Sequence, residues 1–194
     1  MTNSSVYIVL SQSRTTLSQT VRLLTGDRYT HAALSLDEDL EYMFSFGRRW
    51  ARNPFVGCFK HESLEDDLYG PCGFLPGAVI QFPVSHEQYV GVTAQLWDFL
   101  LDGHKFSYNY FGLIANMMRK GRESHTRFFC SEFVYHILHE SGVCDAGKPR
   151  YMIRPQDFME LGGTLIFEGD LKTYRAGCRV SRRGKRSGFA LGHL

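Results

Sequence analysis

Cys130 is the residue of this chain whose neighbours best suit it to nucleophilic chemistry. The apolar residues after it recur at the spacing of one buried helix face: Phe133, Val134, Ile137 and Leu138. This spacing predicts a helix with Cys130 in its first turn. A thiol there meets unpaired backbone N–H groups and the positive end of the helix dipole, and both favour the nucleophilic thiolate. The alternative interpretation of Cys130 is a small buried core residue.

A cysteine nucleophile needs a base that takes its proton and later returns it to the leaving group. His31 is the best candidate, because it begins the apolar run Ala32–Leu36, which predicts a strand. A strand start and a helix N-terminus would each hold their side chain rigidly. We therefore expect Cys130 to be the nucleophile and His31 to be the base and then the acid.

A third group must orient the imidazole, and the predicted hairpin that begins at His31 indicates Ser45. Its arms are predicted over residues 31–36 and 40–46. A three-residue loop between the arms places His31 opposite Ser45, whereas a two-residue loop places it opposite Phe46. We expect Ser45 to accept the imidazole N–H and to orient His31.

Other polar residues fit the third position less well. Glu41 lies about four residues along the ladder, roughly 13 Å from His31, so a regular hairpin excludes it. Glu132 lies on a different side of the predicted helix from Cys130, and His125 lies on a linker. Clustered acids are predicted to lie on the surface: Glu62, Glu65, Asp66 and Asp67. His136 and His139 lack a third ligand at matching spacing, so we expect no metal, and no cofactor is expected either.

The remaining periodicities predict the elements that surround these side chains. Strands are expected over 6–10, 78–84 and 164–168, with short ones near 57–60 and 72–75. Helices are expected after Thr15, from Ser85 to Gly103, over 108–118, from Cys130 to Gly142 and over 154–161. Residues 119–127 are expected to form a basic linker.

Composition indicates an ordinary soluble domain. The chain has 194 residues, of which 43% are hydrophobic and 22% charged, with a net charge of +2. No apolar run approaches the ~18 residues of a membrane span, and no signal peptide is recognisable. The five cysteines form no CxxC pair, so we expect reduced thiols and a cytoplasmic protein.

Basic residues gather at two places in the sequence. One is the loop that contains Arg48, Arg49 and Trp50, and the other is the segment 171–194. We expect residues 1–170 to form one domain and residues 171–194 to form a flexible basic tail. Either basic segment could hold an acidic partner, although nucleic acid is not expected as a partner.

Three stretches of the sequence resemble the circularly permuted NlpC/P60 papain-like group: Thr30–Leu36, Tyr42–Phe46 and Phe129–Val134. This group includes the YiiX/YaeF-type permuted amidases and, more distantly, the lecithin:retinol acyltransferase-like enzymes. The opening strand and the late segment Arg154–Phe158 also fit, so that the similarity spans residues 6–167.

The resemblance implies an α+β fold of the permuted papain-like type, with an antiparallel sheet packed on helices that include the Cys130 helix. It implies a cysteine hydrolase that attacks an amide or ester, peptide or lipid-like, through a thioester acyl-enzyme. The oxyanion would be held by the Cys130 N–H and by a donor from the loop Ser11–Ser13. The family often has a glutamate or histidine where this chain has Ser45. Two alternatives remain open: an acyltransferase with the same site, and a non-catalytic binding module that uses the basic loop and tail.

Overall fold

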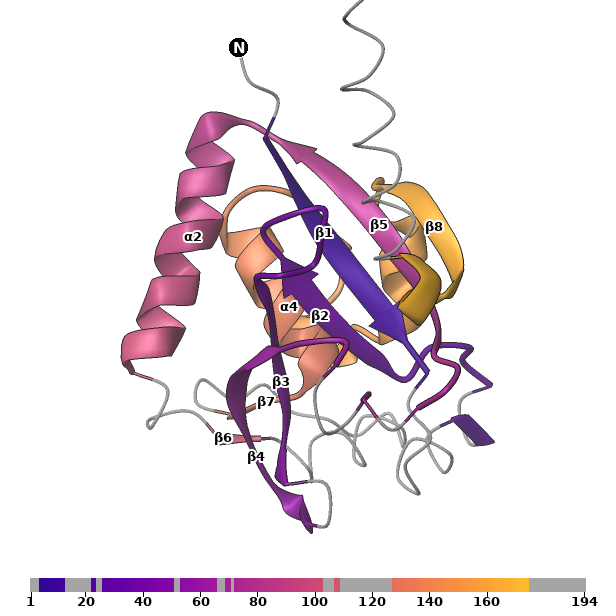
Figure 1. Ribbon diagram of the computed structural model, residues 1–194. Coiled ribbons are helices and arrows are strands. Elements are labelled where there is room, and N and C mark those ends of the chain that lie inside the picture. Colours follow the sequence, from indigo (N-terminus) through magenta and orange to yellow (C-terminus); the bar gives the residue numbers. More distant parts are fainter. Residues whose placement is uncertain are drawn as a thin grey trace, which may run out of the picture.

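A six-stranded antiparallel sheet forms the centre of the molecule (Figure 1). The computed structural model describes residues 4–12, 22–23, 26–50, 53–65, 69–70, 72–102, 107–108 and 127–174. The strands are β1 (Ser4–Ser11), β2 (His31–Ser35), β3 (Met43–Trp50), β4 (Asn53–Glu62), β5 (Pro76–Val84) and β8 (Thr164–Asp170). Their order across the sheet is β4-β3-β2-β1-β5-β8, and every neighbouring pair is antiparallel. The predicted α+β class with an antiparallel sheet is confirmed.

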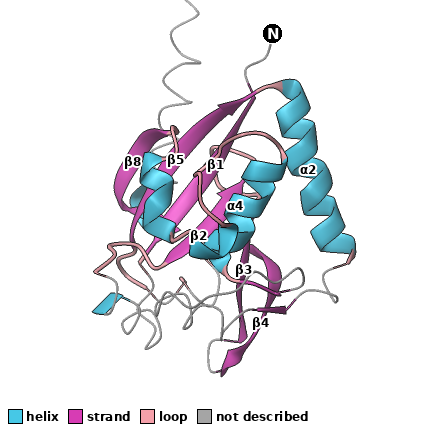
Figure 2. Ribbon diagram, turned by 180° about the vertical axis from the view of Figure 1, so that it is seen from behind, coloured by secondary structure: helices cyan, strands magenta, loops and turns pink. Residues whose placement is uncertain are grey.

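Two α-helices cover one face of this sheet (Figure 2). They are α2 (His86–Leu101) and α4 (Cys130–Glu140). Two short 3-10 helices follow, η2 (Arg150–Met152) and η3 (Pro155–Glu160), and the two-residue strands β6 (Ser107–Tyr108) and β7 (Arg127–Phe128) pair in parallel. Among the described residues, no helix has both the length and the apolar character needed to cross a membrane.

Alternation along β1 explains why the sheet has a core on each face. Val6, Ile8 and Leu10 point toward α2 and α4, whereas Tyr7 and Val9 pack into a second cluster on the opposite face. Strand residues alternate between the faces, so one short apolar run supplies both cores.

The start of α2 and the end of α4 lie where the capping serine and the terminal glycine of the sequence predict them. Ser85 caps α2 by accepting the N–H of Gln88, whose side chain accepts the Ser85 N–H in return. Helix α4 ends just before Gly142, whose φ of 67° is the left-handed conformation that glycine adopts easily. The predicted helix between Cys130 and Gly142 is therefore confirmed.

The register of the β2–β3 hairpin was predicted wrongly. The observed pairs are Leu34 with Phe44 and Ser35 with Met43, which gives a longer connection than either predicted loop. The carboxylate of Asp37 accepts the N–H groups of Glu41 and Tyr42 at 3.0 and 2.8 Å and so stabilises this wider connection.

Several predicted segments lie largely outside the described residues. They are the helix after Thr15, of which residues 22–23 are described and helical, the helix over 108–118, and the linker 119–127. Of the predicted tail, residues 171–174 are helical, and Leu171 and Tyr174 are buried in the second cluster. The packed domain therefore continues past residue 170, and residues 175–194 lie outside the description.

Candidate active site

His31 lies at the first position of β2, where neighbouring segments fix its backbone. It pairs with Ser11 in β1, and the Thr30 N–H donates to the Ser11 carbonyl at 3.0 Å. Asp27 lies four residues before His31, and its carboxylate accepts a hydrogen bond from Arg154 at 3.1 Å. This ion pair ties the segment that leads into β2 to the late part of the chain. The His31 side chain is 15% exposed, so the imidazole is largely enclosed but reachable.

Cys130 is the first residue of α4 and is 5% exposed. Helix α4 packs against β2, and Cys130 lies close enough to the His31 imidazole to help raise the pKa of that ring. The structure thus brings together the two residues that the sequence proposed as a pair. Phe129, at the N-cap of α4, makes no side-chain capping hydrogen bond to the first turn, where Cys130 lies.

The partner that orients His31 is Glu62, the last residue of β4. Its Oε2 lies 3.0 Å from His31 Nε2, and its side chain is completely buried. With Nε2 engaged by the carboxylate, Nδ1 is the ring nitrogen left for the thiol. Helix α4, β2 and β4 thus contribute a thiol, an imidazole and a carboxylate in a row, which are the three kinds of group that a nucleophile, its base and an orienting acid require.

Ser45 does not have the role expected of it. Ser45 is completely buried, but its hydroxyl has no hydrogen-bond partner of normal geometry within the described residues. It is therefore not the partner of His31. It lies instead beside the Glu62 carboxylate, whose pKa it helps to lower. The correction follows from the hairpin register, because continuing the observed pairs along β2 and β3 would bring Gly47, not Ser45, opposite His31.

Glu62 reaches His31 because the β2–β3 ladder is open at this end. Glu62 pairs with Met43 in β3, and Met43 pairs with Ser35 in β2, so Glu62 and His31 share one face of the sheet. A Cβ atom at Gly47 would lie 3.2 Å from Glu62 Oε1, which shows that the carboxylate lies over this glycine. The acidic residues around Glu62 suggested a surface position. The sequence feature that could have indicated a buried side chain here was Gly47, because a glycine inside a strand often marks a place where another group packs closely against the backbone.

The charges of the site stabilise one another. Burial alone lowers the pKa of His31, but the Glu62 carboxylate and Cys130 outweigh it and raise this pKa to about 10. Burial raises the pKa of Glu62, but His31 and then Lys60 outweigh it and lower this pKa to about 2. An imidazolium–carboxylate pair is therefore stable across the neutral range.

Tyr69 extends the line of hydrogen bonds beyond Glu62. Its hydroxyl donates to Glu62 Oε2 at 3.3 Å and accepts from the Ser11 hydroxyl at 3.5 Å. Burial and then the charge of Glu62 raise the pKa of Tyr69 well above its usual value, so Tyr69 acts as a neutral donor. The Ser11 hydroxyl is thus engaged by Tyr69, and Ser13, the other end of the expected oxyanion loop, lies outside the described residues.

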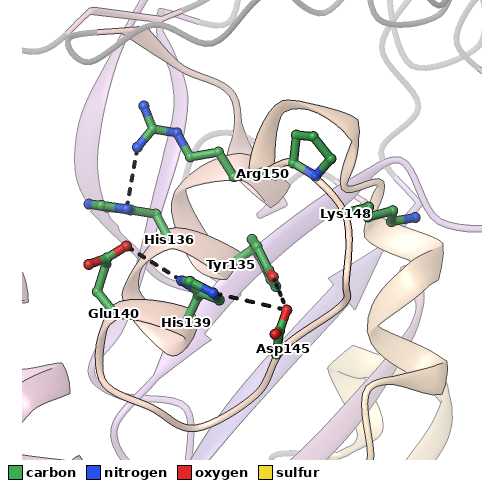
Figure 3. Close-up of a pocket in the computed structure, with 8 residues that line it drawn as sticks. Tyr135, His136, His139, Glu140, Asp145, Lys148 and Arg150 are labelled. Atoms are coloured by element: carbon green, nitrogen blue, oxygen red, sulfur yellow. Dashed lines mark hydrogen bonds and ion pairs between the residues drawn. The ribbon is translucent and has the colours of Figure 1, made fainter.

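The remaining candidates lie along the other side of α4. Glu132 is buried and accepts from Arg150 Nε at 3.3 Å, and Arg150 Nη1 lies 3.5 Å from His136 Nδ1. His139 lies between Glu140 and Asp145 beside a pocket of about 210 Å³, from which Lys148 points away (Figure 3). No group of three or more metal-binding side chains occurs within the described residues.

The predicted basic loop begins within a strand. Arg48, Arg49 and Trp50 belong to β3, but their side chains lie outside the described part of the structure.

No protein-family model, no curated protein and no solved structure matches this chain. The arrangement of Cys130, His31 and Glu62 is therefore the basis for inferring what the protein does.

Proposed function

We propose that the protein is a cysteine hydrolase of amides or esters that acts through a thioester acyl-enzyme. The observation that carries this proposal is the close placement of Cys130 beside His31, whose imidazole in turn contacts the buried Glu62 carboxylate at 3.0 Å. A thiol, an imidazole and a fully buried carboxylate from three separate elements form the combination that nucleophilic acyl transfer needs.

In the acylation step, the Cys130 sulfur attacks the carbonyl carbon and forms a C–S bond. The carbonyl electrons move to oxygen and then return as the bond to the leaving group breaks. The proton held by His31 goes to the departing nitrogen or oxygen. Water, activated by the now neutral His31, then hydrolyses the thioester and restores the thiol.

The first turn of α4 would hold the developing oxyanion. Its N–H groups point along the helix axis and have no intrahelical partner, and Phe129 supplies no capping side chain. Backbone donors of this kind, together with the helix dipole, stabilise negative charge next to the nucleophile.

The chain order of the site supports the permuted papain-like, NlpC/P60-type assignment that the sequence suggested. The histidine comes early, on β2, the acid follows on β4, and the cysteine comes late, at the start of α4. Glu62 supplies the carboxylate that is frequent in that family, from a different position than Ser45. We infer substrates with a peptide or lipid-like amide or ester.

Steady-state hydrolysis of a panel of acyl amides and esters tests the proposal. The Cys130→Ala variant should lose activity by at least about 1000-fold, because the nucleophile is absent. Cys144→Ala is a matched control, because burial and then Asp145 raise the pKa of that thiol to about 11 and leave it unreactive. Activity that survives in Cys130→Ala would refute the proposal. Adding an amine acceptor distinguishes release of free acid from transfer by an acyltransferase.

A further inference from the structure

Lys60 forms an ion pair with the buried acid of the proposed site. It lies two residues before Glu62 on β4, so both side chains project from the same face of the sheet. Lys60 Nζ lies 3.4 Å from Glu62 Oε1, while His31 occupies the other oxygen, Oε2. The Lys60 side chain is 19% exposed, and that of Glu62 is completely buried. One carboxylate thus lies between two cations.

The proposed reaction changes the charge of only one of these cations. When His31 gives its proton to the leaving group, the imidazole becomes neutral and no longer balances Glu62. Tyr69 and Ser45 then face the carboxylate with hydroxyl groups alone. A buried carboxylate without a counter-ion is costly, so the proton would be held on His31 unless another cation remains.

We propose that Lys60 is a positioning residue that keeps Glu62 charge-balanced while His31 is neutral, and so allows His31 to act as the acid. This inference depends on the proposed function, because it concerns proton donation to a leaving group. Lys60 acts through Glu62, whose Oε1 its ammonium group contacts.

The charged groups around His31 agree with this role. Cys130 on α4 faces the imidazole, Glu62 on β4 faces its other side, and Tyr69 faces Glu62 as a neutral donor. Two anions and two cations are present when His31 is protonated and Cys130 is a thiolate. Loss of Lys60 would leave one cation for two anions, which strengthens the hold of the site on the His31 proton.

Leaving-group dependence tests the proposal in single-turnover acylation. p-Nitrophenyl acetate loses its leaving group without protonation, whereas the nitrogen of p-nitroacetanilide must be protonated as it departs. We expect Lys60→Met to slow acylation by the anilide on the order of 10-fold or more and acylation by the ester by less than about threefold. Equal slowing of both substrates would overturn the proposal.

A direct titration of His31 by NMR separates this inference from the proposed function, since it needs no turnover. In a Cys130→Ser background, which removes the sulfur, Lys60→Met should raise the His31 titration midpoint by about one unit or more. A midpoint that does not move would overturn the role of Lys60 even in an active enzyme. A raised midpoint in a protein that forms no acyl-enzyme would support the charge coupling and refute the hydrolase.

Two further variants fix the interpretation. Lys60→Arg keeps the positive charge and should restore the wild-type midpoint and leaving-group pattern, and failure to restore either would count against a role of charge. Lys148→Met removes a lysine that pairs with Asp157, and it should change neither readout. If Lys60→Met does not fold, Lys60→Gln provides the same test with a polar side chain.

Discussion

Glu62 is the residue on which the chemistry of the proposed site depends. Its carboxylate is inaccessible to water and receives His31 at one oxygen and Lys60 at the other. Ser45 is buried next to it but carries no charge, so it cannot stabilise an imidazolium as a carboxylate does. The two residues therefore make different predictions when each is replaced.

Glu62→Gln should slow acylation by an amide on the order of 100-fold, because it removes the charge that holds His31 protonated and oriented. The same change should shift the alkaline fall in rate to lower pH, since the pKa of His31 drops without the carboxylate. Ser45→Ala should slow acylation less than about fivefold, since it removes one hydroxyl from the carboxylate. Rate–pH profiles of the wild type and the two variants test both predictions. If Ser45→Ala slows acylation more than Glu62→Gln does, Ser45 and not Glu62 orients His31.

Gly47 leaves the space in which the Glu62–Lys60 pair lies. A methyl group there would be 3.2 Å from Glu62 Oε1 and 3.2 Å from Lys60 Cε, closer than such groups normally approach. Gly47→Ala should therefore displace the carboxylate and reduce acylation on the order of 10-fold. Gly169→Ala is the control, because it is crowded to 3.3 Å by Phe167 but lies in β8, at the other end of the sheet. Similar losses in both variants would show a general packing effect.

At the scale of elements, local sequence patterns predicted most of the regular structure. The apolar runs of β1, β5 and β8, the capping box of α2 and the span of α4 are each determined by neighbouring residues. The pairing of Cys130 with His31 could also be proposed, because each begins an element that fixes its position.

The third member of the site could not be predicted in this way. Its identity depends on the register across β2, β3 and β4, and the β2–β3 connection is stabilised by hydrogen bonds to the Asp37 side chain, which no local pattern predicts. A register error places a different residue beside His31, and no local pattern distinguishes a buried Glu62 from its acidic neighbours in the sequence.

Gly77 in β5, which lies close both to β1 and to the short helix at residues 171–174, gives a prediction at this scale. A Cβ atom at Gly77 would collide with the backbone carbonyl of Leu10 and with the side chain of Leu171. Gly77→Ala should reduce the free energy of unfolding by about 1–3 kcal/mol or more, because a backbone atom cannot move aside. Gly73→Ala, where the added methyl meets nothing within 4 Å, should change it by less than about 0.5 kcal/mol. Urea unfolding measures both, and equal stabilities would contradict the described packing.

At the scale of the whole molecule, the imidazolium–carboxylate pair makes stability depend on pH. The pKa of His31 is raised from 6.5 to about 10, so its contribution is complete below 6.5 and is lost as the pH rises toward 10. The pKa of Glu62 is lowered from 4.5 to about 2, so its contribution is complete above 4.5 and is lost as the pH falls toward 2. The pair therefore contributes most between pH 4.5 and 6.5.

The double variant His31→Asn, Glu62→Gln lacks both titrating groups, so its stability should lack the pH dependence that they contribute. Its free energy of unfolding should fall furthest below that of the wild type near about pH 5.5. Near about pH 9 the free energy of unfolding of the variant should approach or exceed that of the wild type. The net contribution of a buried pair can be small because of desolvation, but its pH dependence remains. Urea unfolding at the two pH values provides the measurement, and a difference independent of pH would contradict the coupling.

The most direct test of the proposed site is to trap the acyl-enzyme. After brief treatment with an activated acyl ester, intact-mass and peptide mass spectrometry should show one acyl group on Cys130, removable by neutral hydroxylamine as expected for a thioester. His31→Asn should form this adduct at least about 100-fold more slowly, because the thiol loses its base. Acylation at other residues, or acylation of Cys130 at the same rate without His31, would contradict the account.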